Sequence, residues 1–370
     1  MLGKSDASFV YLKFSQTALG LVAFFYILYV SEEIVVPIVF ATIIAILLNP
    51  VVNFLCRFRC NRVLSISIVV VLAILLLAAL GYFLFSQATM LGESLPQFKE
   101  KFFTLLDNAV DWCSLHFNIN KPVLEEWLAK LKTEGINNSS SVIGTTLTSV
   151  GSFLIVFLLL PVYVFMILFY KPLLLEFIEQ LFKNKRHELV AEVLGQTKSL
   201  IQNYLIGLLL EAAIVGALNA GGLLLLGIPY ALLIGVIGAL LNMIPYIGGI
   251  IAIGIPMLMA IATQQPIDAL WVLLLYSLVQ LIDNNIIVPR IVASKVKING
   301  LFSIIVVLVG GALWGVAGMF LAIPLTAILK VLFDRIDGLK PFGFLLGDTQ
   351  EAAVGWQSQI LSRKSKVKKD

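Results

Sequence analysis

The chain has 370 residues, of which 59% are hydrophobic and 13% are charged, and its formal net charge is +4. Soluble globular proteins carry about 25% charged residues, so this composition excludes an ordinary soluble domain. Several apolar runs approach the ~20 residues that a helix needs to cross a bilayer, and their lack of alternation excludes a β-barrel. The modest positive charge fits basic loops on one membrane side better than nucleic-acid binding. We therefore predict an all-α polytopic membrane protein that binds no nucleic acid.

The first part of the chain, residues 1–85, is predicted to consist of transmembrane helices. Residues 14–31 and 34–55 are apolar segments separated by a short acidic turn, a pattern that indicates a helical hairpin. Residues 63–86 form a third apolar span. The loop before this span is basic, which places it in the cytoplasm together with the N-terminus. Its basic residues are Arg57, Arg59 and Arg62.

The composition changes between residues 86 and 149, where apolar residues recur at helical spacing among charged ones. We predict a helical extramembrane insert on the non-cytoplasmic side. It would pack against the membrane surface or a neighbouring subunit or, alternatively, capture substrate. The next region, residues 150–200, is predicted to contain a span at 150–170 and a cytoplasmic amphipathic segment at 171–198.

Two apolar runs in the C-terminal half, 229–262 and 301–333, follow the spans predicted at 201–227 and 268–288. Each run is too long for one span, at about 1.5 Å per residue across about 30 Å of hydrocarbon. Each is broken near its middle by residues that remove or weaken helical hydrogen bonds. The breaks contain Pro245, Gly248 and Gly249 in the first run, and Gly310, Gly311, Gly315 and Gly318 in the second.

The basic loops constrain how these runs cross the membrane. The loop containing Arg290, Lys295 and Lys297 and the basic tail at 337–370 should both be cytoplasmic. Run 301–333 lies between these two cytoplasmic segments, so it must enter and leave the membrane on the cytoplasmic side. By the same reasoning, run 229–262 enters and leaves on the opposite side. This predicts a core at 201–336 in which 201–262 is repeated, inverted, by 268–333, with two re-entrant hairpins and about five to six full spans.

A weak sequence similarity between GIIAIGIP (249–256) and GMFLAIP (318–324) agrees with this repeat. Inverted repeats with broken helices are typical of secondary transporters. The alternative is two kinked single spans, or four short helices that cross the membrane in the ordinary way.

A small set of polar residues lies inside the apolar runs, and polar groups in lipid are costly and often functional. Two carboxylates could couple a proton or a cation to transport, because burial disfavours a bare charge. Amides could bind a polar solute without adding charge. The carboxylates are Glu211 and Asp283, and the proposed solute ligands are Asn242, Gln280, Asn284 and Asn285.

Each of these residues also has a purely structural interpretation. Glu211 could hydrogen-bond a neighbouring helix, and Asp283 could be an interfacial helix terminator. Asn242 could satisfy the broken backbone beside it. Asn219, a further amide in the same runs, could simply pack against Gly221 and Gly222.

Signatures of enzymes are missing from the sequence. It contains no Walker A, HExxH, CxxC or GxSxG pattern. We therefore expect a protein that is not an enzyme, with no catalytic residues, no metal site and no cofactor beyond coupling to H⁺ or Na⁺. Active transport would then use an ion gradient or the gradient of the substrate itself.

Three stretches of the C-terminal half carry motifs that are specific in combination: N-x-x-P-Y-x-G, D-N-N-x-x-x-P and G-G-x-x-W-G-x-x-G-x-x-x-x-x-P. They are LGIPYALLIGVIGALLNMIPYIGG (226–249), LVQLIDNNIIVPRI (278–291) and VGGALWGVAGMFLAIPLTAILKVLFDRI (309–336). In these motifs and in its hydrophobic layout the chain resembles the AI-2E (autoinducer-2 exporter) family. The family often has Glu-Asn-Asn where this chain has Asp283-Asn284-Asn285, and often His-Pro where this chain has Asn299-Gly300.

The resemblance implies a multi-pass protein of the bacterial inner membrane, with both termini in the cytoplasm by the loop charges. Some family members are described as exporters of autoinducer-2 and others as sodium or lithium/proton antiporters. The first hypothesis is therefore export of a small polar solute such as autoinducer-2 by alternating access. The alternatives are a Na⁺(Li⁺)/H⁺ antiporter and an oligomeric membrane scaffold without transport. Expected partners are the lipid bilayer, a small polar solute or monovalent cation, and further copies of the chain.

Overall fold

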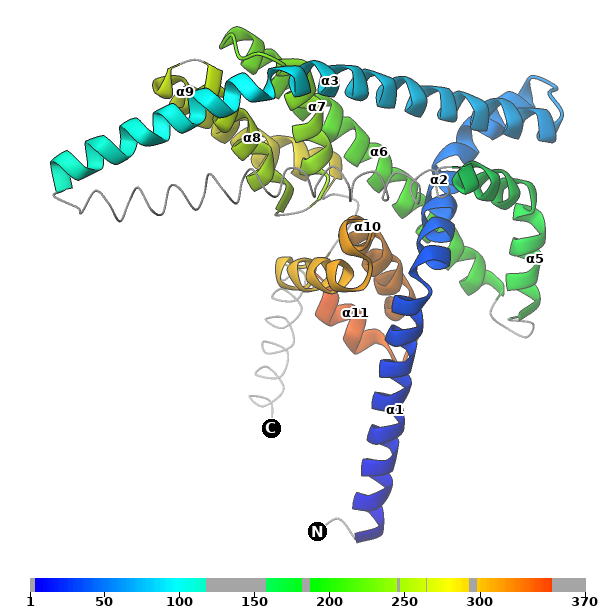
Figure 1. Ribbon diagram of the computed structural model, residues 1–370. Coiled ribbons are helices and arrows are strands. Elements are labelled where there is room, and N and C mark those ends of the chain that lie inside the picture. Colours follow the sequence, from blue (N-terminus) through cyan, green and yellow to red (C-terminus); the bar gives the residue numbers. More distant parts are fainter. Residues whose placement is uncertain are drawn as a thin grey trace, which may run out of the picture. The chain divides into compact units, whose positions relative to one another are not determined.

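The computed structural model describes residues 4–117, 158–181, 187–244, 247–263, 265–292 and 298–347. Every regular element in these ranges is a helix, which confirms the predicted all-α fold (Figure 1). In chain order they are α1 (Lys4–Val30), α2 (Glu32–Arg57), α3 (Arg62–Phe117), α5 (Lys171–Leu181), α6 (His187–Leu225), α7 (Ala231–Asn242), α8 (Ile247–Thr263), α9 (Pro266–Ile282), the π-helical segment η1 (Asp283–Val292), α10 (Gly300–Arg335) and α11 (Lys340–Leu346). A further helix, Leu158–Phe169, precedes α5.

Several predicted features lie outside the described residues. They are the part of the insert beyond residue 117, Pro245 in the first break, the loop lysines at 295 and 297, and the tail from residue 348 onward.

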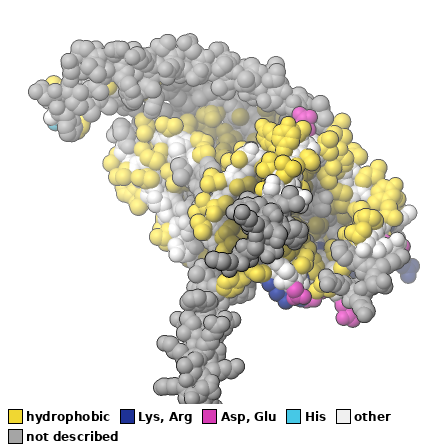
Figure 2. Space-filling view, turned by 90° about the horizontal axis from the view of Figure 1, so that it is seen from below, with side chains coloured by type: hydrophobic (Ala, Val, Ile, Leu, Met, Phe, Trp, Pro, Cys, Tyr) yellow, Lys and Arg dark blue, Asp and Glu magenta, His cyan; other side chains and the backbone are white. Residues whose placement is uncertain are grey.

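The number of helices able to cross a membrane falls in the predicted range, but it includes α10, predicted as a hairpin, and leaves out Ser15–Val30 at the predicted span 14–31, which is shorter. Among the described residues five are long and apolar enough, or up to six if Leu158–Phe169 and Lys171–Leu181, bent by 61°, form one broken span. Figure 2 shows hydrophobic side chains covering most of the described surface on one face, with few charged groups. Such a surface is stable in lipid, where apolar side chains have no reason to be buried.

Two helices extend beyond the predicted spans. The helix predicted at 63–86 continues to Phe117 as α3. The span predicted from residue 201 begins earlier, because α6 starts at His187. In both cases charged and amphipathic sequence continues the helix past the apolar run, since helical hydrogen bonding needs no change of conformation at a membrane surface.

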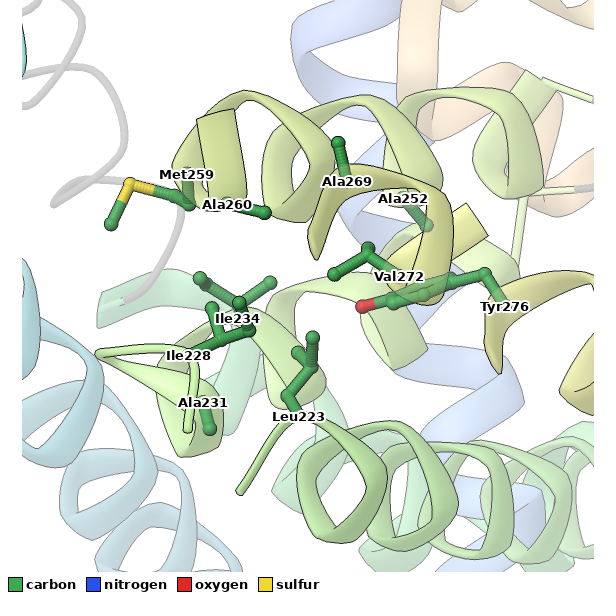
Figure 3. Packing of buried hydrophobic residues seen from close by; sticks show 10 residues of the cluster. All are labelled: Leu223, Ile228, Ala231, Ile234, Ala252, Met259, Ala260, Ala269, Val272 and Tyr276. Carbon is green, nitrogen blue, oxygen red and sulfur yellow. The ribbon is translucent and has the colours of Figure 1, made fainter. Parts of the chain in front are cut away.

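The chain divides into two compact units. Unit 1 contains Met1–Pro50, Met166–Tyr204 and Lys295–Asp370, and unit 2 contains Val51–Phe165 and Leu205–Ser294. Most of the polar residues singled out from the sequence belong to unit 2, whose core packs α7 and α8 with α9 and the end of α6 (Figure 3).

In unit 2, α7 and α8 fold back on each other. The turn into α7 contains Gly227 with φ 68°, a left-handed conformation that ends α6. α7 then ends at Asn242 and α8 begins at Ile247. A Cβ built on Gly238 of α7 would lie 3.6 Å from the Cβ of Ala252 of α8, so the two helices run antiparallel. The predicted break therefore reverses the chain.

In unit 1, α10 also reverses in its middle. Trp314 and Gly315 have non-helical backbone angles, and the φ of 57° at Gly315 is one that glycine adopts readily. Beyond this break, the backbone of Gly318 lies directly against Gly310, a contact that a straight helix could not make. The indole nitrogen of Trp314 donates to the carbonyl of Leu28 at 3.0 Å, which attaches the break to the end of α1. The placement of both fold-back pairs as re-entrant hairpins stays a prediction.

Small residues let α6 and α7 approach closely. A Cβ on Gly235 would lie 2.7 Å from the backbone nitrogen of Ala220, and one on Gly216 would lie 3.1 Å from the Cβ of Ala239. Both helices thus present a small-xxx-small pattern, Gly216–Ala220 and Gly235–Ala239, which is a common packing device of membrane helices. This contact holds the polar residues of α6 beside those of α7.

A pair of cysteines tests the fold-back of α7 on α8. In a background where Cys56, Cys60 and Cys113 are serine, Gly238→Cys with Ala252→Cys is expected to form a disulfide on mild oxidation. The Cβ separation of 3.6 Å falls within the roughly 3.5–4.5 Å of natural disulfides. Mass spectrometry of digested protein detects the cross-linked peptide. Gly238→Cys with Leu258→Cys, whose second site is exposed, is the control; equal cross-linking of both pairs would contradict the fold-back.

Candidate functional site

Three polar side chains, two buried and one partly buried, meet in unit 2, each supplied by a different helix. Glu211 comes from α6, Asn242 is the last residue of α7, and Asp283 stands where α9 passes into η1. Glu211 is 6% exposed and Asp283 is 1% exposed. We call these three residues the carboxylate cluster.

One amide group joins the two carboxylates. The Nδ2 of Asn242 donates to Oε1 of Glu211 at 3.3 Å and to Oδ2 of Asp283 at 3.0 Å. The other oxygen of Asp283, Oδ1, is buried with no hydrogen-bond partner among the described residues. Two carboxylates that share a site repel each other when both are charged. The cluster is therefore suited to binding one proton or one monovalent cation between them.

Local chain breaks place two of these residues. Asn242 lies at the C-terminal end of α7, where the carbonyls of Leu240 and Leu241 accept from the backbone N–H groups of Met243 and Ile244 in a tighter turn. Asp283 begins η1, a π-helical segment, and π-helical turns inside helices are frequent at functional sites. Both breaks coincide with motifs that the sequence singled out.

The remaining predicted solute ligands divide into two groups. Gln280 lies at the edge of the carboxylate cluster: a Cβ on Gly249 would lie 3.4 Å from its Oε1 and 3.8 Å from Oδ1 of Asn242. Its Nε2 donates to Oδ1 of Asn284 at 3.3 Å. Asn284 and Asn285 are exposed, and Asn285 donates to the carbonyl of Leu281 at 2.8 Å. Neither shares a hydrogen bond with the carboxylates among the described contacts.

Apart from Gly315, where an added Cβ would have no heavy atom within 4 Å, the predicted break glycines lie where chain segments meet. A side chain on Gly248 would collide with the carbonyl of Leu241, and Gly310 and Gly318 lie against each other. A Cβ on Gly311 would lie 2.7 Å from the methyl group of Met319. Within the described ranges, no group of three or more His, Cys, Asp or Glu side chains could hold a metal ion.

Sequence reasoning missed Tyr276, which belongs to the buried core of unit 2. Its hydroxyl has no hydrogen-bond partner among the described residues, and the same holds for Oδ1 of Asn219. The available signal was helical phase: Tyr276 stands two turns before Asp283 and therefore on the same face of α9. From the sequence alone, a tyrosine in an apolar run cannot be recognised as a buried group whose hydroxyl lacks a hydrogen-bond partner, because that depends on the residues packed around it.

Comparison with known proteins shows which family the chain belongs to. Residues 19–338 match the model of the AI-2E family transporter. The AI-2 transport protein TqsA of Escherichia coli (strain K12) is 28% identical over 330 residues, covering 86% of this chain and 90% of the relative. YrrI of Bacillus subtilis (strain 168), named as a candidate transport protein, is 28% identical over 317 residues, covering 82% of this chain and 86% of the relative. The resemblance predicted from the motifs is confirmed: the chain belongs to the AI-2E transporter family.

Proposed function

We propose that this protein is a secondary transporter that exports a small polar solute such as autoinducer-2, coupled to a proton or monovalent cation at the carboxylate cluster. The observation that carries the proposal is the pair of buried carboxylates held by a single amide. Such a pair costs folding free energy in lipid unless a cation or proton compensates it. The name of the relative TqsA supports autoinducer-2 as the first solute to test.

Alternating access would use the fold-back pairs of the chain. Residues 201–262 and 268–333 each consist of a long helix followed by a pair that reverses on itself, in keeping with an inverted repeat. Asn242 belongs both to the end of α7 and to the carboxylate cluster. Loading or release of a cation there would therefore change the hydrogen bonding at the break of the first pair. Gln280, Asn284 and Asn285 would contact the solute.

A cation/proton antiporter is the second candidate, and the unpartnered Oδ1 of Asp283 favours it. A buried carboxylate oxygen without a donor is a ready ligand for Na⁺ or Li⁺, which prefer oxygen ligands. In this case Glu211 and Asp283 would bind the ion directly and no organic solute would be needed.

Reconstituted vesicles separate these candidates. The full chain is placed in vesicles with a pH-sensitive dye inside, and autoinducer-2 or NaCl is added across an imposed pH gradient. The exporter is expected to move autoinducer-2 in a gradient-dependent way, whereas the antiporter dissipates the gradient on addition of Na⁺ alone. In either case Asp283→Asn should lower the flux about tenfold or more, because it removes the charge that couples transport.

The control is Glu179→Gln, which removes an exposed carboxylate from α5. It should transport like the wild type. A wild-type protein that moves neither autoinducer-2 nor protons would reject both transport candidates and favour a membrane scaffold.

A further inference from the structure

A second buried polar pair lies in unit 2, apart from the carboxylate cluster. Asn219 of α6 is 3% exposed and Tyr276 of α9 is 4% exposed. The Oδ1 of Asn219 and the hydroxyl of Tyr276 both lack a hydrogen-bond partner among the described residues. Buried polar groups are nearly always hydrogen-bonded, because desolvation without a partner is costly. Each of these two unpartnered groups therefore requires an explanation.

Gly238 of α7 brings the two groups to one place. A Cβ on Gly238 would lie 3.5 Å from the hydroxyl of Tyr276 and 4.0 Å from Nδ2 of Asn219. The methyl group of Ala252 bounds the same space at 3.6 Å. Figure 3 shows the Tyr276 ring lying across the buried cluster with its hydroxyl oxygen directed inward. The glycine thus leaves room beside two polar groups that point to it from different helices.

The pair is in register with the carboxylate cluster along two helices. Asn219 follows Glu211 on α6, and Tyr276 precedes Asp283 on α9, each by two helical turns or roughly 10–12 Å along the axis. The turns between them carry Val215 and Val279, which are 3% and 5% exposed and belong to one buried cluster. An apolar layer therefore separates two polar layers on the same helix faces.

We propose that Asn219 and Tyr276 form a second binding site on the transport path, and that it takes a hydroxyl group. A hydroxyl beside Gly238 can accept from Nδ2 of Asn219 and also bond the Tyr276 hydroxyl, so it supplies the partner that the tyrosine lacks. The three heavy atoms nearest to a Cβ on Gly238 belong to Tyr276, Ala252 and Asn219, none of which is charged, so a cation bound there would have no counter-charge beside it. The hydroxyl belongs to the polar solute or to a water that accompanies the proton.

This inference rests on the proposed transport function and adds a position for the solute beyond the carboxylate cluster. The valine layer between the two sites would oppose free passage of a bare ion, because apolar surroundings do not replace its hydration. The solute or water would move between two polar layers, and the charge would stay with the carboxylates.

Two conservative variants test the second site in vesicles containing the full chain. Tyr276→Phe removes only the hydroxyl, and Gly238→Ala adds one methyl group at ordinary contact distance. Both are expected to fold, and the thermal midpoint of Tyr276→Phe should be equal to or above that of the wild type, because an unpartnered buried group is lost. Transport should fall about tenfold in each. Tyr82→Phe, at an exposed tyrosine, and Gly254→Ala, with open space around it, are the controls.

The kinetics identify the source of the hydroxyl. If it belongs to the solute, Tyr276→Phe raises the KM for autoinducer-2 and leaves proton movement without solute unchanged. If it belongs to water, the rate of proton movement falls and the KM is unchanged. Both results support the second site.

Wild-type transport in both variants would overturn the second site and leave the proposed function intact. A lower thermal midpoint in Tyr276→Phe, with flux lost in proportion to folded protein, would overturn it in favour of a structural role. A wild-type protein without flux would instead overturn the proposed function itself.

Discussion

Replacing Asn242 with leucine is expected to abolish transport and to lower the free energy of unfolding by about 2–4 kcal/mol. The amide of Asn242 is the donor that Glu211 and Asp283 share, at 3.3 and 3.0 Å. Leucine has a similar size but no donor, so it leaves two buried carboxylates facing each other. Flux in vesicles measures the first effect, and thermal unfolding in detergent, followed by intrinsic fluorescence, measures the second.

Two further variants separate loss of the donor from loss of packing. Asn203→Leu changes an exposed amide of α6 that bonds only Ser199 among the described contacts, and it should change stability by no more than about 0.5 kcal/mol. Adding Glu211→Gln and Asp283→Asn to Asn242→Leu removes both charges and should restore most of the stability but not transport. If this triple variant were as unstable as Asn242→Leu alone, the cost would come from the leucine and not from the carboxylates.

Gly235→Val is expected to impair folding strongly, because it breaks the close packing of α6 on α7. Its Cβ would lie 2.7 Å from the backbone nitrogen of Ala220 and 2.8 Å from the Cα, and backbone atoms cannot move aside as a flexible side chain can. Separation of α6 from α7 should cost roughly 3 kcal/mol or more and reduce the yield of folded protein. Size-exclusion chromatography and thermal unfolding in detergent would show aggregation and a lower midpoint.

Gly221→Val is the matched control on α6, because a Cβ there would have no heavy atom within 4 Å. Its stability should stay within about 0.5 kcal/mol of the wild type. Equal midpoints for Gly235→Val and the wild type would mean that α6 and α7 do not pack through these small residues.

The helical framework could be predicted because lipid leaves few choices. Each apolar run must satisfy its own backbone hydrogen bonds, so runs near 20 residues become helices. The breaks at Asn242–Gly249 and Gly310–Gly318 were also visible, because glycine and proline weaken helices wherever they occur. The length of α3 and the early start of α6 could not be predicted, because a helix does not need to end where its apolar run ends.

The candidate site was visible only in part. Glu211 and Asp283 stand out as charges inside apolar runs, and the tertiary structure adds that Asn242 joins them. Asn284 and Asn285 look as promising as Asp283 in the sequence. In the structure Asp283 differs from these two neighbours, because successive residues of a helix point in different directions. Asp283 is 1% exposed, whereas Asn284 and Asn285 are exposed.

By itself, then, the sequence determined a polytopic helical membrane protein, the positions of its two breaks and its family. These follow from the local cost of unpaired backbone groups in lipid and from motifs contained in single stretches of the chain. The tertiary structure alone decided that Asn242 bridges the carboxylates and that Tyr276 and Asn219 face a common space beside Gly238. The physical reason is that both groupings join residues from helices distant in the chain, and only the packing of those helices brings their side chains together.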